Sequence, residues 1–373
     1  MAKQNYYSIE NLLKTESTYN LLLGERSNGK SYAVKKLVLW ESFHKADYLK
    51  FLTTKKIVPK KRYKFGYMRR WKDEIKSRNI EQYFEDMPIE EITDGQYTTV
   101  ICYRGDIYFG NVENGKNVRG ELIGSTFALN VASHYKSLAF PEIGNIVFEE
   151  FLTNEGYLNT ETSKLESIVS TIARRELCQV FMIGNTINRM CPYFDEWQLT
   201  HIKKQEIGTI DIYNQHTDQY DDNNKQIIVK IAVEYCGNSG NNSHMFFGNS
   251  AKSINGGCWD TNVYPHLQGS LRDYKRLYQV DYEYSTFGFI INLLVTTDNE
   301  PFLFVYPKTK TNDKIQRKVS DKFTTDIMTT SYLTELTKYD TLVLQLLRSN
   351  KVVYSDNLTG TEFEQLKKDK GGY

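Results

Sequence analysis

Residues 24–31 read Gly24-Glu25-Arg26-Ser27-Asn28-Gly29-Lys30-Ser31, and this Gly-x4-Gly-Lys-Ser run follows directly on the apolar stretch Tyr-Asn-Leu-Leu-Leu at residues 19–23. From Lys30 onward the apolar residues recur at helical spacing, so the pattern predicts a strand, a glycine loop and a helix. In such a loop backbone N–H groups converge on phosphate oxygens, the lysine bridges the β- and γ-phosphates, and the serine hydroxyl binds Mg²⁺. The run therefore predicts a P-loop for ATP and Mg²⁺. The residues expected to contact the nucleotide are Gly24, Arg26, Ser27, Asn28, Gly29, Lys30, Ser31 and Tyr32.

A second motif is the apolar run Asn-Ile-Val-Phe at residues 145–148, which ends in Glu149 and Glu150. An acidic pair at this place fits a Walker B element, with the first acid directed to Mg²⁺ and the second positioned to polarise the attacking water. Asp is the usual first residue. Because Glu149 is one methylene longer, we expect contact with the ion through a water molecule rather than directly. A strand that ends in two solvated acids is the alternative.

Other candidates for the catalytic set lie at the ends of expected elements. Asn185 follows an expected strand at residues 179–183 and is placed to sense the γ-phosphate or the water, or else is a turn residue. Arg26 in the loop, and Arg174 and Arg175 at the end of an expected helix, are candidates for stabilising charge on the transferring phosphoryl group. Solvated surface arginines are the alternative interpretation.

Alternating strands and helices in the first half of the chain predict an α/β fold. Its sheet should be mainly parallel and covered by helices on both faces. The expected strands are residues 19–23, 64–68, 98–103, 106–111, 145–148 and 179–183, and the expected helix after the acidic pair spans about 161–175. We assign residues 1–197 to this P-loop domain. Residues 198–275 form an expected irregular linker with one strand at 226–235, and residues 276–373 a smaller α+β domain.

The bulk composition restricts the function classes less than the motifs do. The net charge is +1, so a case for nucleic acid rests on local patches, of which residues 55–72 are the plainest, with nine basic and no acidic side chains. That stretch contacts nucleic-acid phosphates or is a solvated loop. The five cysteines include no CxxC pair, which argues against a zinc ribbon and favours a reducing cytosol. No charged-then-apolar leader opens the sequence, and apolar runs are shorter than roughly 18 residues, so we expect a soluble protein that spans no membrane.

With these motifs in hand, the chain resembles the DNA-packaging (encapsidation) ATPases of phi-twenty-nine-type tailed phages, compact relatives of the large terminase motors. The resemblance is good over about residues 1–195 and faint beyond 280. It is carried by GERSNGKSYAV at residues 24–34, YMRRWKDEI at 67–75, NIVFEEFL at 145–152 and the tract 175–194.

The resemblance implies roles for several residues. Lys30 and Ser31 would hold phosphate and Mg²⁺, and Glu149 and Glu150 would be the Walker B acids, although the family has Asp at the position of Glu149. Lys72 matches a lysine that acts on a neighbouring subunit's nucleotide. The family's arginine finger corresponds to Arg174 or Arg175. Tyr6 or Tyr7 is a candidate for stacking on adenine.

The same resemblance implies an assembly. It is a homo-oligomeric ring, of five subunits, that docks on the portal (connector) of an empty phage capsid and drives double-stranded DNA inward as ATP is hydrolysed, with a structural packaging RNA as a further expected partner. DNA would be held through its phosphates without sequence readout. The expected location is the host cytoplasm, transiently at the portal vertex, with no subunits left in the mature virion.

The second domain, by the same resemblance, has an RNase H-like fold that has lost catalysis and serves for docking and DNA contact. The first strand expected there, residues 287–295, carries no acid, and Asp298 and Glu300 fall in the turn after it. Because a two-metal nuclease needs several converging carboxylates, we expect no DNA cleavage. Two alternatives to the motor remain: another P-loop enzyme, such as a helicase-like ATPase or a small-molecule kinase, and a non-enzymatic nucleotide-binding capsid factor.

Overall fold

The chain forms two compact units that interleave along the sequence. The computed structural model describes residues 7–26, 28–153, 156–174, 178–185, 189–220, 224, 226–237, 263–284, 287–308, 316–320, 329–330 and 336–369. Unit 1 comprises residues 1–153, 158–187 and 201–259, and unit 2 comprises 154–157, 188–200 and 260–373. The stretch 198–275, which the sequence suggested as a linker, is therefore divided between the two units.

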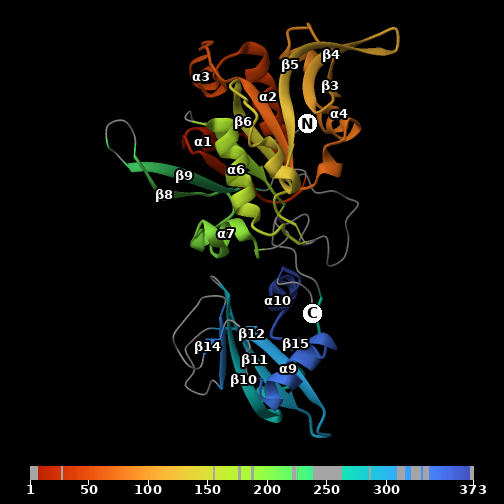
Figure 1. Ribbon diagram of the computed structural model, residues 1–373, viewed down its shortest axis with the longest axis vertical. Helices are drawn as coiled ribbons and strands as arrows, with labels where there is room; N and C mark the ends of the chain where they lie inside the picture. Colours follow the sequence, from red (N-terminus) through yellow and green to blue (C-terminus); the bar gives the residue numbers. More distant parts are fainter. Residues whose placement is uncertain are drawn as a thin grey trace, which may run out of the picture. The chain divides into compact units, whose positions relative to one another are not determined.

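Unit 1 is built on a nine-stranded sheet of order β3-β4-β5-β2-β6-β7-β1-β9-β8 (Figure 1). Its strands are β1 (Tyr19–Leu23), β2 (Lys64–Arg69), β3 (Thr99–Tyr103), β4 (Asp106–Glu113), β5 (Lys116–Ala128), β6 (Ile143–Glu149), β7 (Gln179–Ile183), β8 (Ile210–Tyr220) and β9 (Gln226–Tyr235). The six strands from β5 to β9 in this order run parallel, and antiparallel pairs complete both edges. The expectation of a mainly parallel sheet is confirmed.

Helices cover both faces of this sheet. The helices of unit 1 are α1 (Glu10–Leu13), α2 (Lys30–His44), α3 (Tyr48–Thr54), α4 (Ser77–Phe84), α5 (Ile89–Ile92) and α6 (Glu161–Ala173), with 3₁₀ turns η1 (Lys72–Ile75), η2 (Leu129–Tyr135) and η3 (Thr200–Lys203). Helices α1 to α5 enclose one core with strand residues such as Leu22, Val147 and Phe181. Helix α6 contacts β6 on the other face, where Leu165 and Ile168 are buried. Because β1 and β6 are buried along their whole length, their near-continuous apolar sequences are those of central parallel strands.

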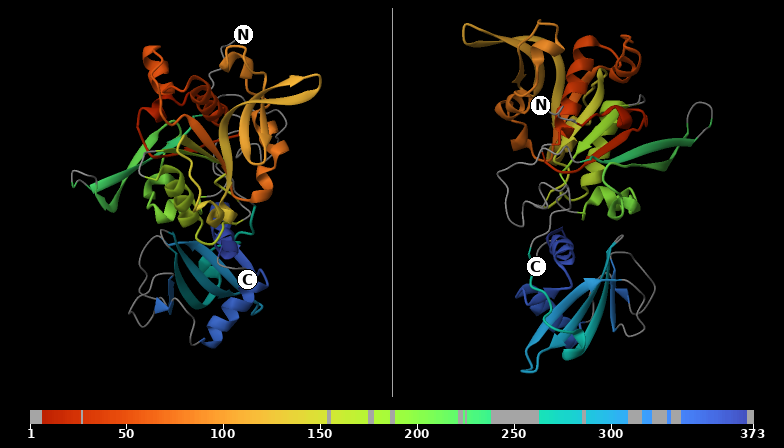
Figure 2. Two further views of the ribbon diagram at one scale, coloured as in Figure 1. Left: turned by 45° about the horizontal axis from the view of Figure 1, so that its top comes forward. Right: turned by 180° about the vertical axis from the view of Figure 1, so that it is seen from behind.

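Two strands of unit 1 escaped the sequence analysis because they leave the body of the sheet as hairpin arms (Figure 2). After β4, which the sequence predicted as residues 106–111, the chain turns at Asn114-Gly115 into the long strand β5, whose first half is exposed. Strand β8 is rich in polar residues and pairs with β9, which itself runs parallel to β1. The supposed linker thus supplies two strands of the sheet, because the apolar residues of β9 complete the core beside β1.

Unit 2 carries a six-stranded sheet of order β14-β13-β10-β11-β12-β15. Its elements are α7 (Pro192–Glu196), η4 (Leu271–Asp273), β10 (Lys275–Tyr284), β11 (Phe287–Val295), β12 (Pro301–Pro307), β13 (Arg317–Ser320), β14 (Thr329–Thr330), α9 (Lys338–Arg348), β15 (Val352–Tyr354) and α10 (Asn357–Asp369). Strands β10, β11 and β12 form an antiparallel meander, and β13 adds parallel to β10. Side chains of α9 and α10 pack on one face of this sheet. The first strand is thus β10, not residues 287–295, and it does carry acids.

Candidate nucleotide-binding and catalytic site

The candidate site lies where four neighbouring parallel strands end. Strands β2, β6, β7 and β1 lie side by side in that order, so their carboxyl ends meet at one edge of the sheet. Ligands of parallel α/β sheets bind at this edge, because the loops that follow the strands converge there. The P-loop follows β1, the acidic pair ends β6, Asn185 follows β7, and Arg69 ends β2.

The loop between β1 and α2 turns on two glycines with positive φ, 145° at Gly24 and 94° at Gly29. A Cβ on Gly24 would lie 3.1 Å from both Asn28 Nδ2 and the carbonyl oxygen of Cys236. The Asn28 Oδ1 accepts a hydrogen bond of 3.2 Å from the Lys30 N–H. Its Nδ2 is buried and has no hydrogen-bond partner within the described part of the chain. A buried donor left open in such a loop fits a ligand with acceptor oxygens, such as a phosphate.

Lys30 is 4 % exposed, and its ammonium donates to the main-chain oxygen of Glu25. Burial lowers the pKa of Lys30 to about 8, although the charges of Glu149 and Glu25 act in the opposite direction. A buried ammonium with so few anionic neighbours is poorly compensated. A polyphosphate beside it would supply the missing negative charge.

Glu149 is buried at the end of β6 and is held by two hydroxyl groups. Tyr83 of α4 donates a hydrogen bond of 2.6 Å to its Oε1, and Ser31 bonds to the same carboxyl group. Burial raises the pKa of Glu149, whereas the bonds from Tyr83 and Ser31 lower it. The contact with Ser31 joins the two residues expected to hold Mg²⁺. The longer side chain of Glu149 is thus fixed in place by Tyr83.

Glu150, in contrast, is exposed and has an unusual backbone conformation. Its φ is 56°, a left-handed value that costs a residue with a side chain about 1 kcal/mol or more. Its Oε2 accepts a hydrogen bond of 2.7 Å from Arg69 Nη2, and the same guanidinium contacts Glu74. The strained turn directs the second acid away from the core. An unusual backbone at this position is a reason to expect a functional role.

A cleft of about 200 Å³ brings together two of the expected catalytic residues, Glu150 and Asn185, with the expected Mg²⁺ ligands and Arg26. Its lining includes Arg26, Ser31, Glu149, Glu150 and Asn185. These side chains come from the P-loop, the end of β6 and the end of β7, which are distant in sequence. The cleft is small and polar, which suits a phosphate group and a water molecule better than a bulky substrate.

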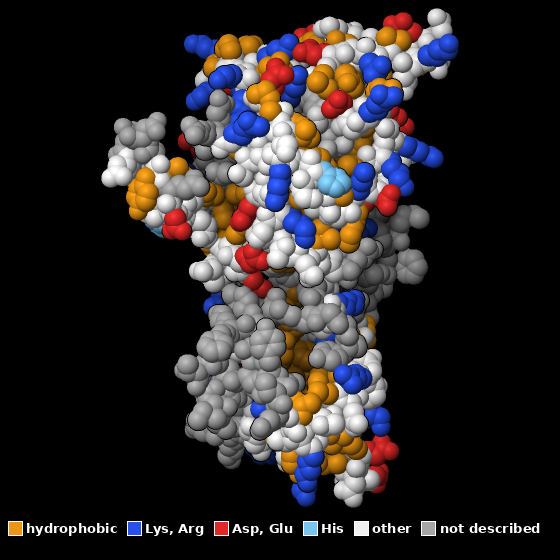
Figure 3. Space-filling model, viewed as in Figure 1, with side chains coloured by type: hydrophobic (Ala, Val, Ile, Leu, Met, Phe, Trp, Pro, Cys, Tyr) orange, Lys and Arg blue, Asp and Glu red, His pale blue; other side chains and the backbone are white. Residues whose placement is uncertain are grey.

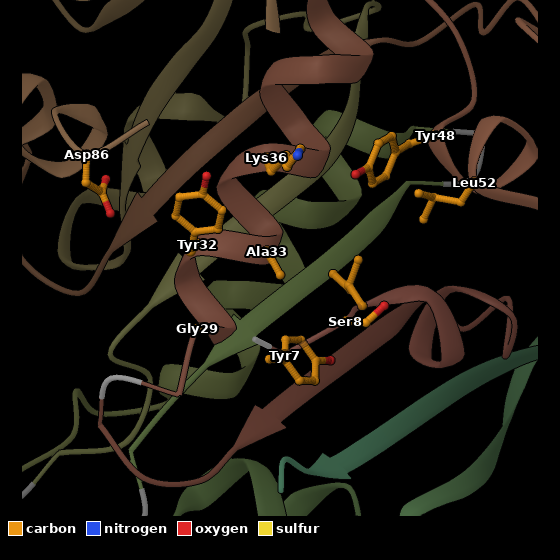
Figure 4. A pocket seen from close by; sticks show the side chains of 10 residues that line it. Tyr7, Ser8, Gly29, Tyr32, Ala33, Lys36, Tyr48, Leu52 and Asp86 are labelled. Atoms are coloured by element: carbon orange, nitrogen blue, oxygen red, sulfur yellow. The ribbon is translucent and has the colours of Figure 1, made fainter. Parts of the chain in front are cut away.

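A second cavity of about 500 Å³ lies beside the start of α2 and is bordered by Gly29 of the P-loop (Figure 4). Tyr7 and Ser8 reach it from the N-terminal segment, and Gly29 and Tyr32 come from the P-loop and the first turn of α2. The Tyr7 hydroxyl donates a hydrogen bond of 2.6 Å to Glu234, the pKa of which burial raises to about 7. Tyr32 therefore borders this aromatic cavity and not the acidic cleft. Tyr6 lies outside the described residues.

Lys72 and Arg174 do not join either cavity. Lys72 is exposed at the start of η1, just after β2, and its N–H donates to Asn130 Oδ1 at 3.0 Å. Arg174 is exposed at the end of α6, where its Nη2 donates to the Leu138 oxygen at 3.0 Å. Because α6 runs back from the carboxyl ends of the strands, Arg174 lies at the edge opposite the P-loop. Ser27 and Arg175 lie outside the described residues.

Helix α6 is fastened at both ends by arginines that flank β2. At its start, the buried Arg70 forms a bidentate ion pair with Glu161, with Nε–Oε2 at 2.9 Å and Nη2–Oε1 at 2.9 Å. At its end, Arg62 donates to the main-chain oxygens of Ile172 at 2.6 Å and Ala173 at 3.1 Å. Cations at a helix C-terminus and carboxylates at its N-terminus are both favoured by the helix dipole. The helix is therefore held along the length of β2.

Arg69 and Tyr83 are the functional candidates that the sequence analysis missed. Arg69 belongs to the stretch 67–75 that carries the family resemblance, but that resemblance implies a role for Lys72 only, and it is the sheet order that brings the end of β2 beside Glu150. Nothing in the sequence marks Tyr83, because a tyrosine in an amphipathic helix reads as a core residue. The contact of each depends on long-range packing.

Within the described ranges, no cluster of three or more His, Cys, Asp or Glu side chains is arranged to hold a metal ion. None of the described helices is long and apolar enough to cross a lipid bilayer. A Mg²⁺ ion in the acidic cleft would therefore depend on the nucleotide phosphates for several of its ligands, as is usual for Mg²⁺.

The glycine loop, the following helix and the acidic pair at the sheet edge define the class of P-loop proteins. Within this class, residues 1–217 match the model of the Podovirus DNA encapsidation protein (Gp16) family, so the chain belongs to that family. It is 27% identical over 203 residues to the DNA packaging protein of Bacillus phage phi29, an alignment that covers 52% of this chain and 50% of that protein. The chain thus matches about half the length of this curated relative.

Two solved structures resemble the chain over nearly its whole length. The Phi-28 gp11 DNA packaging motor has a TM-score of 0.50 at 17% identity, covering 98% of each chain. The bacteriophage Phi-29 viral genome packaging motor assembly gives 0.51 at 19% identity, covering 97% of this chain and 98% of that one. At these identities the likeness concerns the fold. It extends through both units, although the family match ends at residue 217.

Proposed function

We propose that the protein is an ATP-driven motor that moves double-stranded DNA into a preformed phage capsid. The observation that carries the proposal is the cleft in which Ser31, Glu149, Glu150 and Asn185 lie together beside Lys30. This set provides phosphate binding, Mg²⁺ binding and activation of water in one place. The chain belongs to a DNA encapsidation family, and this membership supports coupling of ATP hydrolysis to DNA movement.

ATP binds across the start of α2, with its two ends on either side of the P-loop. The loop N–H groups and Lys30 hold the β- and γ-phosphates, and Arg26 and Asn185 face the γ-phosphate in the acidic cleft. The base enters the cavity bordered by Tyr7 and Tyr32, because such aromatic walls suit a flat heterocycle. The open Nδ2 of Asn28 supports phosphate binding at this loop.

Glu150 accepts the proton of the attacking water in this mechanism. Its exposed carboxylate reaches into the cleft, and the bond to Arg69 holds it until the site is complete. Ser31 and Glu149 would hold Mg²⁺, which would supply positive charge to neutralise the β- and γ-phosphates. Tyr83 keeps the Glu149 carboxyl group beside Ser31.

Catalysis is completed by a neighbouring subunit in a homo-oligomeric ring, for which we propose five members. Arg174 supports this arrangement, because it is exposed at the sheet edge opposite its own P-loop and cannot serve its own nucleotide there. A guanidinium supplied in trans, by Arg174 or Arg175, would stabilise the transferring phosphoryl group, with help from Lys72. Such an arrangement makes hydrolysis depend on assembly.

DNA contact is assigned to the exposed basic surface over α3 and the loop that follows it, where Figure 3 shows a concentration of lysine and arginine side chains. Lys50, Lys55, Lys56 and Lys61 are exposed in this region. These cations would bind phosphates without reading bases, as transport of a whole genome requires. The portal of an empty capsid and a structural RNA are the further partners we propose. The protein would act transiently at the portal vertex, from the host cytoplasm, and be absent from the mature virion.

Unit 2 is proposed to be an RNase H-type domain that docks and contacts DNA without cutting it. Support comes from its topology: the three-strand meander β10-β11-β12, with β13 and then β14 added in parallel beside the first strand.

The deciding experiment measures ATP hydrolysis by purified protein alone, with DNA, and with empty capsids bearing a portal. A motor should hydrolyse faster with DNA and capsids, and capsids should protect DNA from nuclease only when ATP is present. Lys30→Ala should abolish hydrolysis and Glu150→Gln should bind ATP but turn over poorly. Full hydrolysis without DNA and phosphorylation of a metabolite would identify a kinase, and nucleotide binding with no turnover would identify a scaffold.

A further inference from the structure

The sheet of unit 2 has an unusual second face. One face, with Tyr278, Val280 and Phe289, packs in the core with α9 and α10. Because side chains alternate along a strand, Asp281 and Glu283 of β10 point to the opposite face. Asn292 of β11 lies on that face too, because it pairs across the strands with Gln279, which is two residues before Asp281 on the same face of β10. Asp281 is 1 % exposed and Asn292 is fully buried. This face therefore buries polar groups such as Asp281 and Asn292 beside apolar residues such as Ile290.

Several of these buried polar atoms lack a partner. In the described part of the chain, neither the Oδ1 nor the Nδ2 of Asn292 makes a hydrogen bond, and the Oδ1 of Asp281 makes none either. Buried polar groups in folded proteins are nearly always paired, so each exception calls for an explanation. Two of these open atoms, Asn292 Oδ1 and Asp281 Oδ1, are oxygens, which are the ligand atoms that hard divalent cations take.

One cation already occupies the space between the two carboxylates. Lys308, directly after β12, places its Nζ 2.7 Å from Asp281 Oδ2, and the same ammonium bonds to Glu283 Oε1. This contact lowers the pKa of Glu283. Lys318 of β13 lies farther away, with its Nζ 3.5 Å from Glu283 Oε2. The Lys308 ammonium thus bridges two carboxylates in the manner of a hard cation with oxygen ligands.

We propose that Asp281 and Glu283 form a divalent-cation site in which the ammonium of Lys308 takes the place of the metal ion. The ammonium bonds one oxygen of each carboxylate, so its fixed charge occupies the position that Mg²⁺ or Mn²⁺ would take. ATP hydrolysis needs Mg²⁺, so a DNA motor works in solutions that contain this ion. With Lys308 in place, the nuclease-type sheet face binds no metal ion, and two-metal cleavage of the DNA cannot begin. This role of Lys308 rests on the proposed RNase H-type character of unit 2, whereas binding of an ion by Asp281 and Glu283 can be measured without DNA cleavage or ATP hydrolysis.

The test replaces Lys308 in the full chain and measures Mn²⁺ binding without nucleotide, from the electron paramagnetic resonance signal of free Mn²⁺. Lys308→Met should bind one more Mn²⁺ per chain than the wild type. It should also unfold at a lower temperature than the wild type in EDTA, and Mn²⁺ should reverse most of that decrease. Lys308→Gln, which keeps a hydrogen-bond donor, is the second variant if Lys308→Met does not fold, and it should show the same gain.

Two controls identify the site. Asp281→Asn combined with Lys308→Met should lose the additional Mn²⁺, because the ligand is gone while the paired charges remain balanced. Lys318→Met removes a lysine that contacts only the outer carboxylate at longer range, and should bind no additional ion. The proposal is wrong if neither Lys308 variant binds more Mn²⁺ than the wild type. It is equally wrong if the wild type already binds an ion that Asp281→Asn abolishes.

Discussion

The Arg69 guanidinium and the Glu150 carboxylate meet at 2.7 Å across the ends of two adjacent strands, β2 and β6. Glu150 is the proposed acceptor of the water proton, and a carboxylate engaged with a guanidinium is less available for that role. The pair is partly solvated, with 16 % of the Arg69 side chain and 62 % of the Glu150 side chain exposed. Such pairs are worth at most about 1 kcal/mol, so Arg69 can restrain Glu150 but can also release it.

From this relationship we predict that Arg69→Ala raises ATP hydrolysis in the absence of DNA by up to about fivefold, the factor that corresponds to about 1 kcal/mol. The ratio of DNA-stimulated to basal rate should fall accordingly. Arg69→Lys, which keeps the charge, should resemble the wild type more closely. If the basal and stimulated rates of Arg69→Ala fall together instead, Arg69 positions Glu150 for catalysis and does not restrain it.

The buried ammonium of Lys30 predicts a specific pH dependence of stability. Its pKa falls from 10.5 to about 8 on folding, a penalty of roughly 3 kcal/mol for the charged form at neutral pH. Between these two pH values the unfolded chain binds a proton that the folded chain does not, so folding stability rises with pH there and is unaffected below pH 8. Urea unfolding of nucleotide-free protein should show this rise in the wild type relative to Lys30→Met. Parallel curves for the two proteins from pH 7 to 10 would exclude it.

Tyr83→Phe should weaken the proposed Mg²⁺ site without disturbing the fold. The hydrogen bond from Tyr83 lowers the pKa of Glu149, so its removal raises that pKa further and a smaller fraction is ionised near neutral pH. Hydrolysis should then need a higher Mg²⁺ concentration, and the acidic limb of its pH–rate profile should move to higher pH. Tyr63→Phe is the matched control, since it removes a hydroxyl that bonds to Glu142 at 3.0 Å, outside the acidic cleft. An unchanged Mg²⁺ requirement in Tyr83→Phe would argue against the role of Tyr83.

Arg174→Ala should retain nucleotide binding but lose the turnover that depends on assembly, by 10³-fold or more if it is the finger, on the order of known cases. Arg175→Ala is the parallel variant. Mixing the defective arginine variant with Lys30→Ala should restore partial activity, because some interfaces then combine an intact P-loop with an intact arginine. If both arginine variants hydrolyse ATP normally on capsids, or if no mixture exceeds its components, the trans-acting arrangement must be abandoned.

Replacing Lys55, Lys56 and Lys61 by Ala should weaken DNA binding about equally for all sequences. For each DNA phosphate that the variant no longer neutralises, the slope of log K against log salt should become shallower by about 0.9. Lys14→Ala, which alters a surface lysine paired with Glu10, is the control and should leave the slope unchanged. An unaltered slope in the triple variant would place the DNA-binding surface elsewhere.

The sequence predicted the elements whose reasons are local. Residues 19–23, the helix from Lys30 and the run ending at Glu149 could be placed because glycine spacing and apolar runs depend on near neighbours. Strands β5, β8 and β10 could not, because polar residues dominate their exposed parts and their pairing partners determine them. For the same reason Glu150 was identified, whereas its contact with Arg69 was not. Asp281 and Glu283 were not identified as acids of the first strand, because β10 itself was not predicted.

The two arginine contacts that fasten α6 beside β2 have a mechanical consequence. Arg70 binds the start of the helix at Glu161 and Arg62 binds its end at Ile172, so we expect the helix and the strand to move as one rigid unit. Arg174 is at one end of this unit, and Arg69 is at the other end, next to Glu150. A displacement of Arg174 by a neighbouring molecule would therefore be transmitted to the surroundings of Glu150, the proposed acceptor of the water proton, without refolding of a loop. The unit of α6 and β2 would thus couple a force on the subunit surface to the reactivity of the catalytic cleft.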